Sequence, residues 1–382
     1  MGLLNLFKAL LVVLLPMGLY SVESRPADIC FFVTDMKYSR ERGIKICEVQ
    51  HGILSMFKGT SFLVPGDVSI QQRFLGVLSQ YSPKGWTILT HIDDPGLRWV
   101  LSTAYNWRVK NSLQEIFQDH EFLAHAKQPV HDKSDLSAYH GFLFASASLL
   151  KKDEELEERC PGIIVIDKSS FPFWVDKYKM TVLFDRDPIL SAMKPKWGLY
   201  KKEYSKDLAS KIISDLKCNA FVIKPRGAFL GNGVILVEKD QLDSVLEYII
   251  NSSQSAKDHP DPAFNYWSKD RFNSFIVEEF ATSDLVMAPH LGTKIYQPTM
   301  RVAFVLVHTK GAFNVHFLGA YWKTPTFSVF EEASFMQKNK DICEPPFYLA
   351  VDPETWADVK NKLQIALPIL HKEMLLARQA NR

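Results

Sequence analysis

The chain has 382 residues, of which 47% are hydrophobic and 23% are charged, and its formal net charge is +2. This composition is typical of a globular protein and excludes a disordered or collagen-like chain. The length allows two domains of ordinary size. Because the charge is nearly balanced and the basic residues are dispersed, we expect no nucleic-acid partner.

An apolar run lies near the N-terminus, over residues 9–20. It is shorter than the roughly 20 residues of a membrane-spanning helix and suits the hydrophobic core of a secretory signal. Val22 and Ser24 are small enough to precede a cleavage site before Arg25. We therefore predict a signal peptide over residues 1–24 and an exported or secreted protein. The alternatives are an uncleaved anchor, which would be the only membrane contact, or a misassigned start and a cytoplasmic protein.

Residues 25–165 are predicted to form a small mixed α/β domain. Short apolar runs indicate strands over residues 29–33, 85–90 and 162–166, and the patterns over 113–122 and 143–158 favour helices. The five cysteines (Cys30, Cys47, Cys160, Cys218 and Cys343) are widely spaced and show neither zinc nor CxxC spacing. We expect them to be small buried side chains, and the spacing leaves any disulfide pairing open.

The stretch over residues 221–238 reads FVIKPRGAFLGNGVILVE. Two β-branched runs flank a loop that contains Gly227, Gly231 and Gly233, and Lys224 ends the first run. Glycine lets backbone N–H groups approach an anion closely, and a lysine supplies the compensating charge. Because a strand rather than a helix follows and GxxxxGK[ST] is absent, this is not a Walker loop. The pattern predicts either a phosphate-binding hairpin or an ordinary hairpin with a mobile loop.

Neighbouring segments carry further candidates. Asp176 and Lys177 precede a predicted helix, and residues 274–280 form an apolar strand that ends in Glu278 and Glu279, with Asp284 soon after. Adjacent side chains on a strand face opposite ways, so only one of the two glutamates can point inward, and we expect it to be Glu278.

Two later strands each carry a cation, Arg301 at the start of residues 299–306 and Lys323 at the end of residues 314–323. Taken in this order, the segments between about residues 166 and 380 resemble the ATP-grasp superfamily, and more loosely its tubulin-tyrosine-ligase-like members. The resemblance implies an α/β fold, in which a pre-grasp domain over 25–165 precedes an ATP-grasp-like domain over 166–382. A glycine-loop lid subdomain would span roughly residues 177–278.

The resemblance also implies a reaction: ATP phosphorylates a carboxylate, an amine displaces the phosphate, and ADP is released. Arg301 and Lys323 would then be catalytic, and ATP and Mg²⁺ would be the cofactors. Both substrates are left open, and a protein is one candidate for them. The residues implied to bind the nucleotide are Lys177, Lys224, Gly227, Gly231, Gly233, Glu278, Glu279 and Asp284.

The metal ligands depart from the family's pattern. ATP-grasp enzymes hold magnesium with an acid on one late strand and Glu-x-Asn on the next, after a helix that resembles residues 353–376. Here the sequence ends soon after that helix, which Pro368 should bend or interrupt. Glu331, Glu332 and Asn339 are the nearest candidates, and we expect Glu332 to be the ligand. The alternative function is a non-catalytic, exported nucleotide-binding or interaction module with the same fold.

Overall fold

The computed structural model describes residues 25–52, 59–63, 70–81, 87–90, 106–109, 113–144, 150–228, 231–251 and 259–380. The predicted signal peptide over residues 1–24 lies outside this range, so its cleavage and the export of the protein stay predictions. Among the described helices, none combines the length and the apolar character that a membrane span requires.

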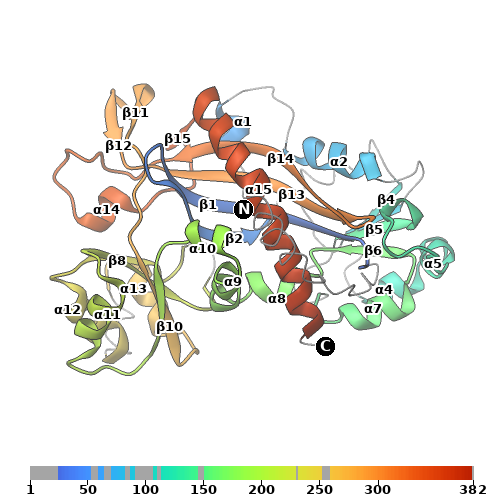
Figure 1. The fold of residues 1–382 in the computed structure, drawn as a ribbon, viewed down its shortest axis with the longest axis horizontal. Coiled ribbons are helices and arrows are strands. Elements are labelled where there is room, and N and C mark those ends of the chain that lie inside the picture. The colour runs from blue at the N-terminus through green and yellow to red at the C-terminus, as the bar shows by residue number, and fades with distance from the viewer. Residues whose placement is uncertain are drawn as a thin grey trace, which may run out of the picture.

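A five-stranded antiparallel sheet runs through the middle of the molecule (Figure 1), with the strand order β15-β14-β13-β1-β2. Its strands are β1 (Asp28–Ser39), β2 (Gly43–His51), β13 (Thr299–Thr309), β14 (Ala312–Lys323) and β15 (Tyr348–Leu349). The sheet thus joins the first described strands of the chain to the last ones. We call it the central sheet.

Alternation along β1 gives the central sheet two different faces. Cys30, Phe32 and Met36 pack with α15 (Pro353–Ala380), which crosses the sheet in Figure 1 and continues through Pro368. Asp352 caps this helix, since its carboxylate accepts a hydrogen bond from the Thr355 amide at 2.9 Å. The shorter helices α9 (Lys177–Phe184) and α10 (Pro188–Ala192) cover the same face.

The opposite face of the central sheet packs against a parallel sheet with the strand order β4-β3-β5-β6. Phe142 and Ile164 of the parallel sheet face the central sheet together with α2 (Ile70–Tyr81), whereas Leu143 and Val165 face the outer helices. The strands are β3 (Thr87–Thr90), β4 (Asn106–Val109), β5 (Gly141–Phe144) and β6 (Ile163–Ile166), and the outer helices are α4 (Leu113–Gln118), α5 (His120–Ala126) and α7 (Asp153–Arg159).

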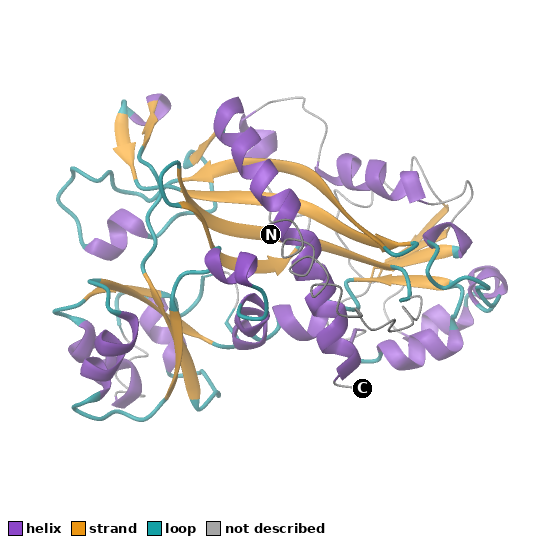
Figure 2. Ribbon diagram, in the orientation of Figure 1, coloured by secondary structure: helices purple, strands orange, loops and turns teal. Residues whose placement is uncertain are grey.

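A second antiparallel sheet, which we call the lid sheet, has the strand order β7-β10-β8-β9 and lies beside the central sheet (Figure 2). One of its faces packs against three helices, and this core includes Phe221, Ile223, Phe275 and Val277. The strands are β7 (Trp197–Lys201), β8 (Ala220–Pro225), β9 (Ile235–Glu238) and β10 (Ser274–Glu279), and the helices are α11 (Leu208–Leu216), α12 (Leu242–Asn251) and α13 (Pro262–Trp267).

Short elements complete the described fold: α1 (Gly59–Leu63), α8 (Phe171–Trp174), β11 (Val286–Ala288), β12 (Lys294–Tyr296) and α14 (Phe335–Asn339). The prediction of an α/β fold is confirmed, and so are the strands expected around residues 221–223, 234–237, 274–280, 299–306 and 314–323.

Two features differ from the sequence-based expectation. Residues 141–144 form a strand, whereas the sequence pattern predicted a helix from residue 143 onward. A short apolar run has the same appearance in a strand and in a helix, so the pattern alone does not distinguish them. In addition, β1 and β2 pair in one sheet with β13, although residues 25–165 were expected to form a separate domain. Pairing across more than 250 residues leaves no local signal in the sequence.

Candidate functional site

A cavity of about 420 Å³ lies between the central sheet and the lid sheet. Both walls are strands, so side chains at alternate positions point into the space between them. The residues that line it are Asp35, Lys37, Cys47, Glu48, Gln50, Lys177, Pro195, Val222, Lys224, Gly231, Val234, Leu236, Glu278, Glu279, Phe280, Ala281, Thr299, Arg301, Lys323, Asn339, Lys340, Asp341 and Cys343.

Strand alternation explains how β8 contributes to the cavity. Phe221 and Ile223 enter the core of the lid, and therefore Val222 and Lys224 point the other way, into the cavity. Val222 pairs with Leu236 on β9, so the lid wall has an apolar surface next to its cations. A flat heteroaromatic ring would fit such a surface, because apolar walls with a few polar groups are typical of small-molecule sites.

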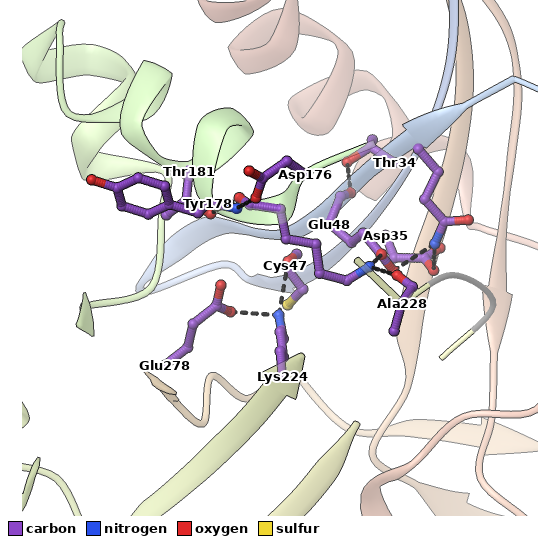
Figure 3. A network of polar contacts seen from close by, with 12 residues as sticks. Thr34, Asp35, Cys47, Glu48, Asp176, Tyr178, Thr181, Lys224, Ala228 and Glu278 are labelled. Carbon is purple, nitrogen blue, oxygen red and sulfur yellow. Dashed lines mark hydrogen bonds and ion pairs between the residues drawn. The ribbon is translucent and has the colours of Figure 1, made fainter. Parts of the chain in front are cut away.

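The first charged cluster of the cavity joins the two sheets (Figure 3). The Lys224 Nζ atom lies 2.6 Å from Glu278 Oε2 and donates to the carbonyl oxygen of Cys47, on β2, at 2.9 Å. Lys194 binds the other oxygen of Glu278 at 2.5 Å. Burial opposes ionisation of Glu278, but the two ammonium groups outweigh it and lower the pKa of this carboxyl. Ionisation of Glu278 is therefore favoured by the two lysines on either side of it.

A second contact between the sheets involves Lys177, whose ammonium lies 2.7 Å from Glu48 Oε1 on β2 and also donates to the carbonyl oxygen of Ala228. The preceding residue fixes its position: Asp176 caps α9 by accepting a hydrogen bond from the Tyr178 amide at 3.0 Å. Asp176 also binds Arg226 in the glycine loop, with 2.5 Å between Nη2 and Oδ2. The Asp-Lys pair thus connects α9, the glycine loop and the central sheet.

The third cluster lies on the central sheet and is formed by Asp35, Arg301, Lys323 and Asp341. Arg301 donates to both oxygens of Asp35, at 2.8 and 2.7 Å, and the Lys323 Nζ atom lies 2.9 Å from Asp35 Oδ2. Lys323 also contacts a carboxylate oxygen of Asp341. Burial disfavours the charged forms, yet these ion pairs lower the pKa of both carboxyls and raise those of Arg301 and Lys323. All four groups are therefore charged.

Two further cations of the cavity contact neutral oxygen atoms. Lys37 donates to the carbonyl oxygen of Pro298 at 2.9 Å, and Lys340 donates to that of Val234 at 3.2 Å. Burial is the main reason why the pKa of each of these lysines is lowered. An anion bound beside them would favour their charged forms.

Seven of the sequence-predicted site residues line this one cavity. They are Lys177, Lys224, Gly231, Glu278, Glu279, Arg301 and Lys323. Glu278 points inward as expected, whereas Glu279 accepts a hydrogen bond from the Lys196 amide at 3.0 Å. Alternation thus separates their contacts, although both glutamates line the cavity.

Four predicted site residues do not line the cavity. A Cβ atom at Gly227 would come within 2.6 Å of the Phe272 ring, and Gly233 has a positive φ of 70°, so both glycines shape the loop. Asp284 accepts a hydrogen bond from the Arg40 amide at 2.8 Å, away from the cavity. The fourth residue, Glu332, is exposed and lies outside the cavity.

Glu331, the neighbour of Glu332, has a structural role. Its ion pair with Lys294, at 2.5 Å, and its hydrogen bond from the Ser328 amide, at 2.6 Å, lower the pKa of its carboxyl to about 2. Both acids near the last cationic strand therefore lie elsewhere than we expected, because sequence proximity does not determine where a loop folds back.

Sequence reasoning missed Asp35, Lys37, Lys194, Lys340 and Asp341. Asp35 and Lys37 continue the alternation of β1 beyond its apolar part, and this signal could have shown that they share one face. Asp341 reaches the cavity through an isolated bridge to Pro325, just after β14. No local pattern in the sequence indicates that bridge.

The donor set of this cavity does not fit the magnesium ion that the ATP-grasp resemblance implies. Mg²⁺ requires oxygen ligands at about 2.0–2.1 Å, usually one or two carboxylates together with phosphates and water. Strands β13 and β14 carry no acid. The carboxylates beside them, Asp35 and Asp341, already bind Arg301 and Lys323. Their negative charge is thus neutralised by the protein itself.

No protein-family model matches this chain, and no curated protein matches it in sequence. Solved structures similar to it include D-cycloserine synthetase DcsG, with 10% identity, a TM-score of 0.36, and coverage of 75% of this chain and 82% of that chain. D-alanyl-alanine synthetase A from Vibrio cholerae O1 biovar eltor str. N16961 has 11% identity, a TM-score of 0.37, and coverage of 74% and 81%. The D-alanine-D-alanine ligase from Coxiella burnetii has 9% identity, a TM-score of 0.30, and coverage of 78% and 98%. These TM-scores are low, so the function proposed below rests on the cavity of this chain.

Proposed function

We propose that the cavity binds ATP and that the chain is an ATP-grasp-like, ADP-forming ligase that joins a carboxylate to an amine. One observation carries the proposal: a cavity between two antiparallel sheets, with an apolar surface on one wall and six cationic side chains around it. The six cations are Lys37, Lys177, Lys224, Arg301, Lys323 and Lys340.

The arrangement of these cations favours a polyphosphate over a single anion. They come from both sheets, from α9 and from the segment after α14, so they line several walls of the cavity. Arginine can bind a phosphate through two parallel hydrogen bonds, and lysine acts as a compact point charge. Lys37 and Lys340 contact only neutral carbonyl oxygens among their described hydrogen bonds, so a bound anion would favour their charged forms without competing with a hydrogen-bonded carboxylate.

The reaction that we propose is phosphoryl transfer followed by ligation. A substrate carboxylate attacks the γ-phosphate, ADP leaves, and an amine then displaces phosphate from the acyl phosphate. Such transfer depends on positioning and on stabilising the charge of the phosphoryl group. Arg301 and Lys323 lie on the central sheet, opposite the lid, where they would supply that charge. The two substrates are of unassigned identity, and a protein is a candidate for either.

A second candidate function is that of a non-catalytic nucleotide-binding module. The observation that favours it is that each lining carboxylate already has a partner: Lys323 for Asp35 and Asp341, Lys177 for Glu48, Lys224 for Glu278, and the Lys196 amide for Glu279. An acid that is held by a cation or an amide is a weaker base and a poorer metal ligand than an unpaired one.

The experiment is calorimetric titration of the protein with ATP, ADP and AMP, followed by an assay for ADP release. Hydroxylamine serves as a generic amine, because it converts an acyl phosphate into a hydroxamate. We expect saturable ATP binding, and hydroxamate with some member of a panel of carboxylic acids. Failure to bind ATP would contradict both candidate functions. Binding without ADP release across the panel would favour the non-catalytic module.

We also propose that the protein is exported and that residues 1–24 are removed. The support is the short apolar run over residues 9–20, followed by small residues before Arg25. N-terminal sequencing of the secreted protein should begin at or near Arg25. Secreted protein that begins at Met1 would contradict cleavage, and a purely cytosolic protein would contradict export.

A further inference from the structure

The cluster on the central sheet contains a lysine in an unusual position. The ammonium group of Lys323 lies between two carboxylates, 2.9 Å from Asp35 Oδ2 and in contact with Asp341 Oδ2. Its side chain is 2% exposed, yet it lines the cavity. Two acids that share one cation on the wall of a cavity are the arrangement in which a divalent ion would be expected.

The remaining oxygen atoms of the two acids are also occupied. Arg301 binds both oxygens of Asp35, and the Thr299 hydroxyl donates to Asp341 Oδ1 at 3.1 Å. The two acids and the two cations therefore balance in charge. A divalent ion would have to displace the Lys323 ammonium from between the two acids, and it would then lie close to two further cations, Arg301 and Lys37.

We propose that the cavity binds the polyphosphate without a divalent cation, and that the Lys323 ammonium takes the place of that ion between Asp35 and Asp341. This inference rests on the proposed ATP-binding function. It predicts that metal-free ATP binds at least as tightly as its magnesium complex, because the protein's own cations face the phosphates.

The first test compares ATP binding by titration calorimetry in excess Mg²⁺ and in excess EDTA. We expect equal or higher affinity in EDTA. A loss of affinity of about tenfold or more in EDTA, which corresponds to roughly 1.4 kcal/mol, would overturn the inference while the proposed ATP binding stands. If ATP does not bind in either buffer, the proposed function itself fails.

The second test requires no nucleotide, so it can fail or succeed independently of the proposed ATP binding. Mn²⁺ alone is titrated into the protein, and the free ion is measured by electron paramagnetic resonance. The unmodified protein should leave Mn²⁺ free. The variant Lys323→Met should gain one Mn²⁺ site, because it frees Asp341 Oδ2 and removes one of the two cations at Asp35 Oδ2. Tight Mn²⁺ binding by the unmodified protein, or no gain in the variant, would overturn the inference.

Two further variants control for changes in folding and in overall charge. Lys340→Met also removes a cation from the cavity wall, but Lys340 contacts the carbonyl oxygen of Val234 and no acid, so no Mn²⁺ site should appear. The double variant Lys323→Met, Asp341→Asn restores the charge balance of the cluster and should lose the gained site. Mn²⁺ binding that persists in the double variant would show that the ion binds elsewhere.

Discussion

Replacing Lys224 by methionine should change both the stability of the protein and its affinity for ATP. Lys224 is buried, and its ammonium joins Glu278 on the lid sheet to the carbonyl oxygen of Cys47 on the central sheet. It also lines the cavity. The same side chain therefore stabilises the contact between the sheets and, in our proposal, contacts a phosphate.

The size of each effect follows from the contacts of Lys224. Removing one partner of a buried ion pair costs roughly 3–5 kcal/mol when the other charge is left alone. Glu278 keeps Lys194 at 2.5 Å, so we expect about 2 kcal/mol, close to the value of one charged hydrogen bond. The lost phosphate contact should add a decrease in ATP affinity of about tenfold or more, as for other charge-assisted contacts.

The assay pairs Lys224→Met with Lys194→Met, measuring the free energy of unfolding in urea and ATP affinity by calorimetry. Lys194 binds the opposite oxygen of Glu278 but does not line the cavity. Both variants should therefore lose similar stability, and only Lys224→Met should lose most of its ATP affinity. Lys211→Met, at an exposed ion pair on α11, controls for the loss of one charge. Equal losses of ATP affinity at Lys194 and Lys224 would refute a direct phosphate contact.

Two other predictions concern the glycine loop and pH. Gly233→Ala should lower the melting temperature more than Gly231→Ala. Both glycines have a φ of 70°, so both substitutions strain the backbone. Of the two, only Gly233 has neighbours that a Cβ atom would meet, with a Pro225 ring atom at 2.6 Å. Equal shifts in calorimetric melting would contradict this reasoning. The pKa of Glu278 is lower in the folded protein than the ordinary glutamate pKa of roughly 4.3. Its ionised form therefore stabilises the fold above that ordinary value, and this stabilisation is lost as the pH falls toward the pKa of the folded state. The stability difference between the unmodified protein and Glu278→Gln, measured in urea, should therefore shrink between pH 5 and pH 3, and a constant difference would count against it.

The sequence was most informative where the chemistry is local. The hairpin around the glycine loop and the strand that ends at Glu278 follow from alternation and from glycine content over short spans. The same alternation correctly predicted that Glu278 points toward the cavity, where it binds Lys224. These features depend only on neighbouring residues, so they are readable without the fold.

Features that depend on distant pairing could not be read in this way. Asp35 is the partner of Arg301, and the two residues lie opposite each other because β1 pairs with β13. Their register depends on which face of each strand is apolar and on a third strand, β2, which has a bulge beside Asp35. Proximity along the chain favours Glu332 as the metal ligand. The acid that contacts Lys323 is Asp341, which is placed there by its bridge to Pro325.

The contacts between the sheets link ligand binding to the position of the lid. Lys224 on the lid sheet and Lys177 on α9 each bind a β2 residue, Cys47 and Glu48 respectively, and Lys177 also donates to Ala228 in the glycine loop. An anion that takes either ammonium group must therefore compete with the central sheet for it. A polyphosphate can compete for these ammonium groups without separating the sheets, because Arg301 on the opposite wall of the cavity can bind the same anion. A longer phosphate chain offers more oxygen atoms to the cations of both walls than a single phosphate does. ATP should therefore bind more tightly than inorganic phosphate in the same titration.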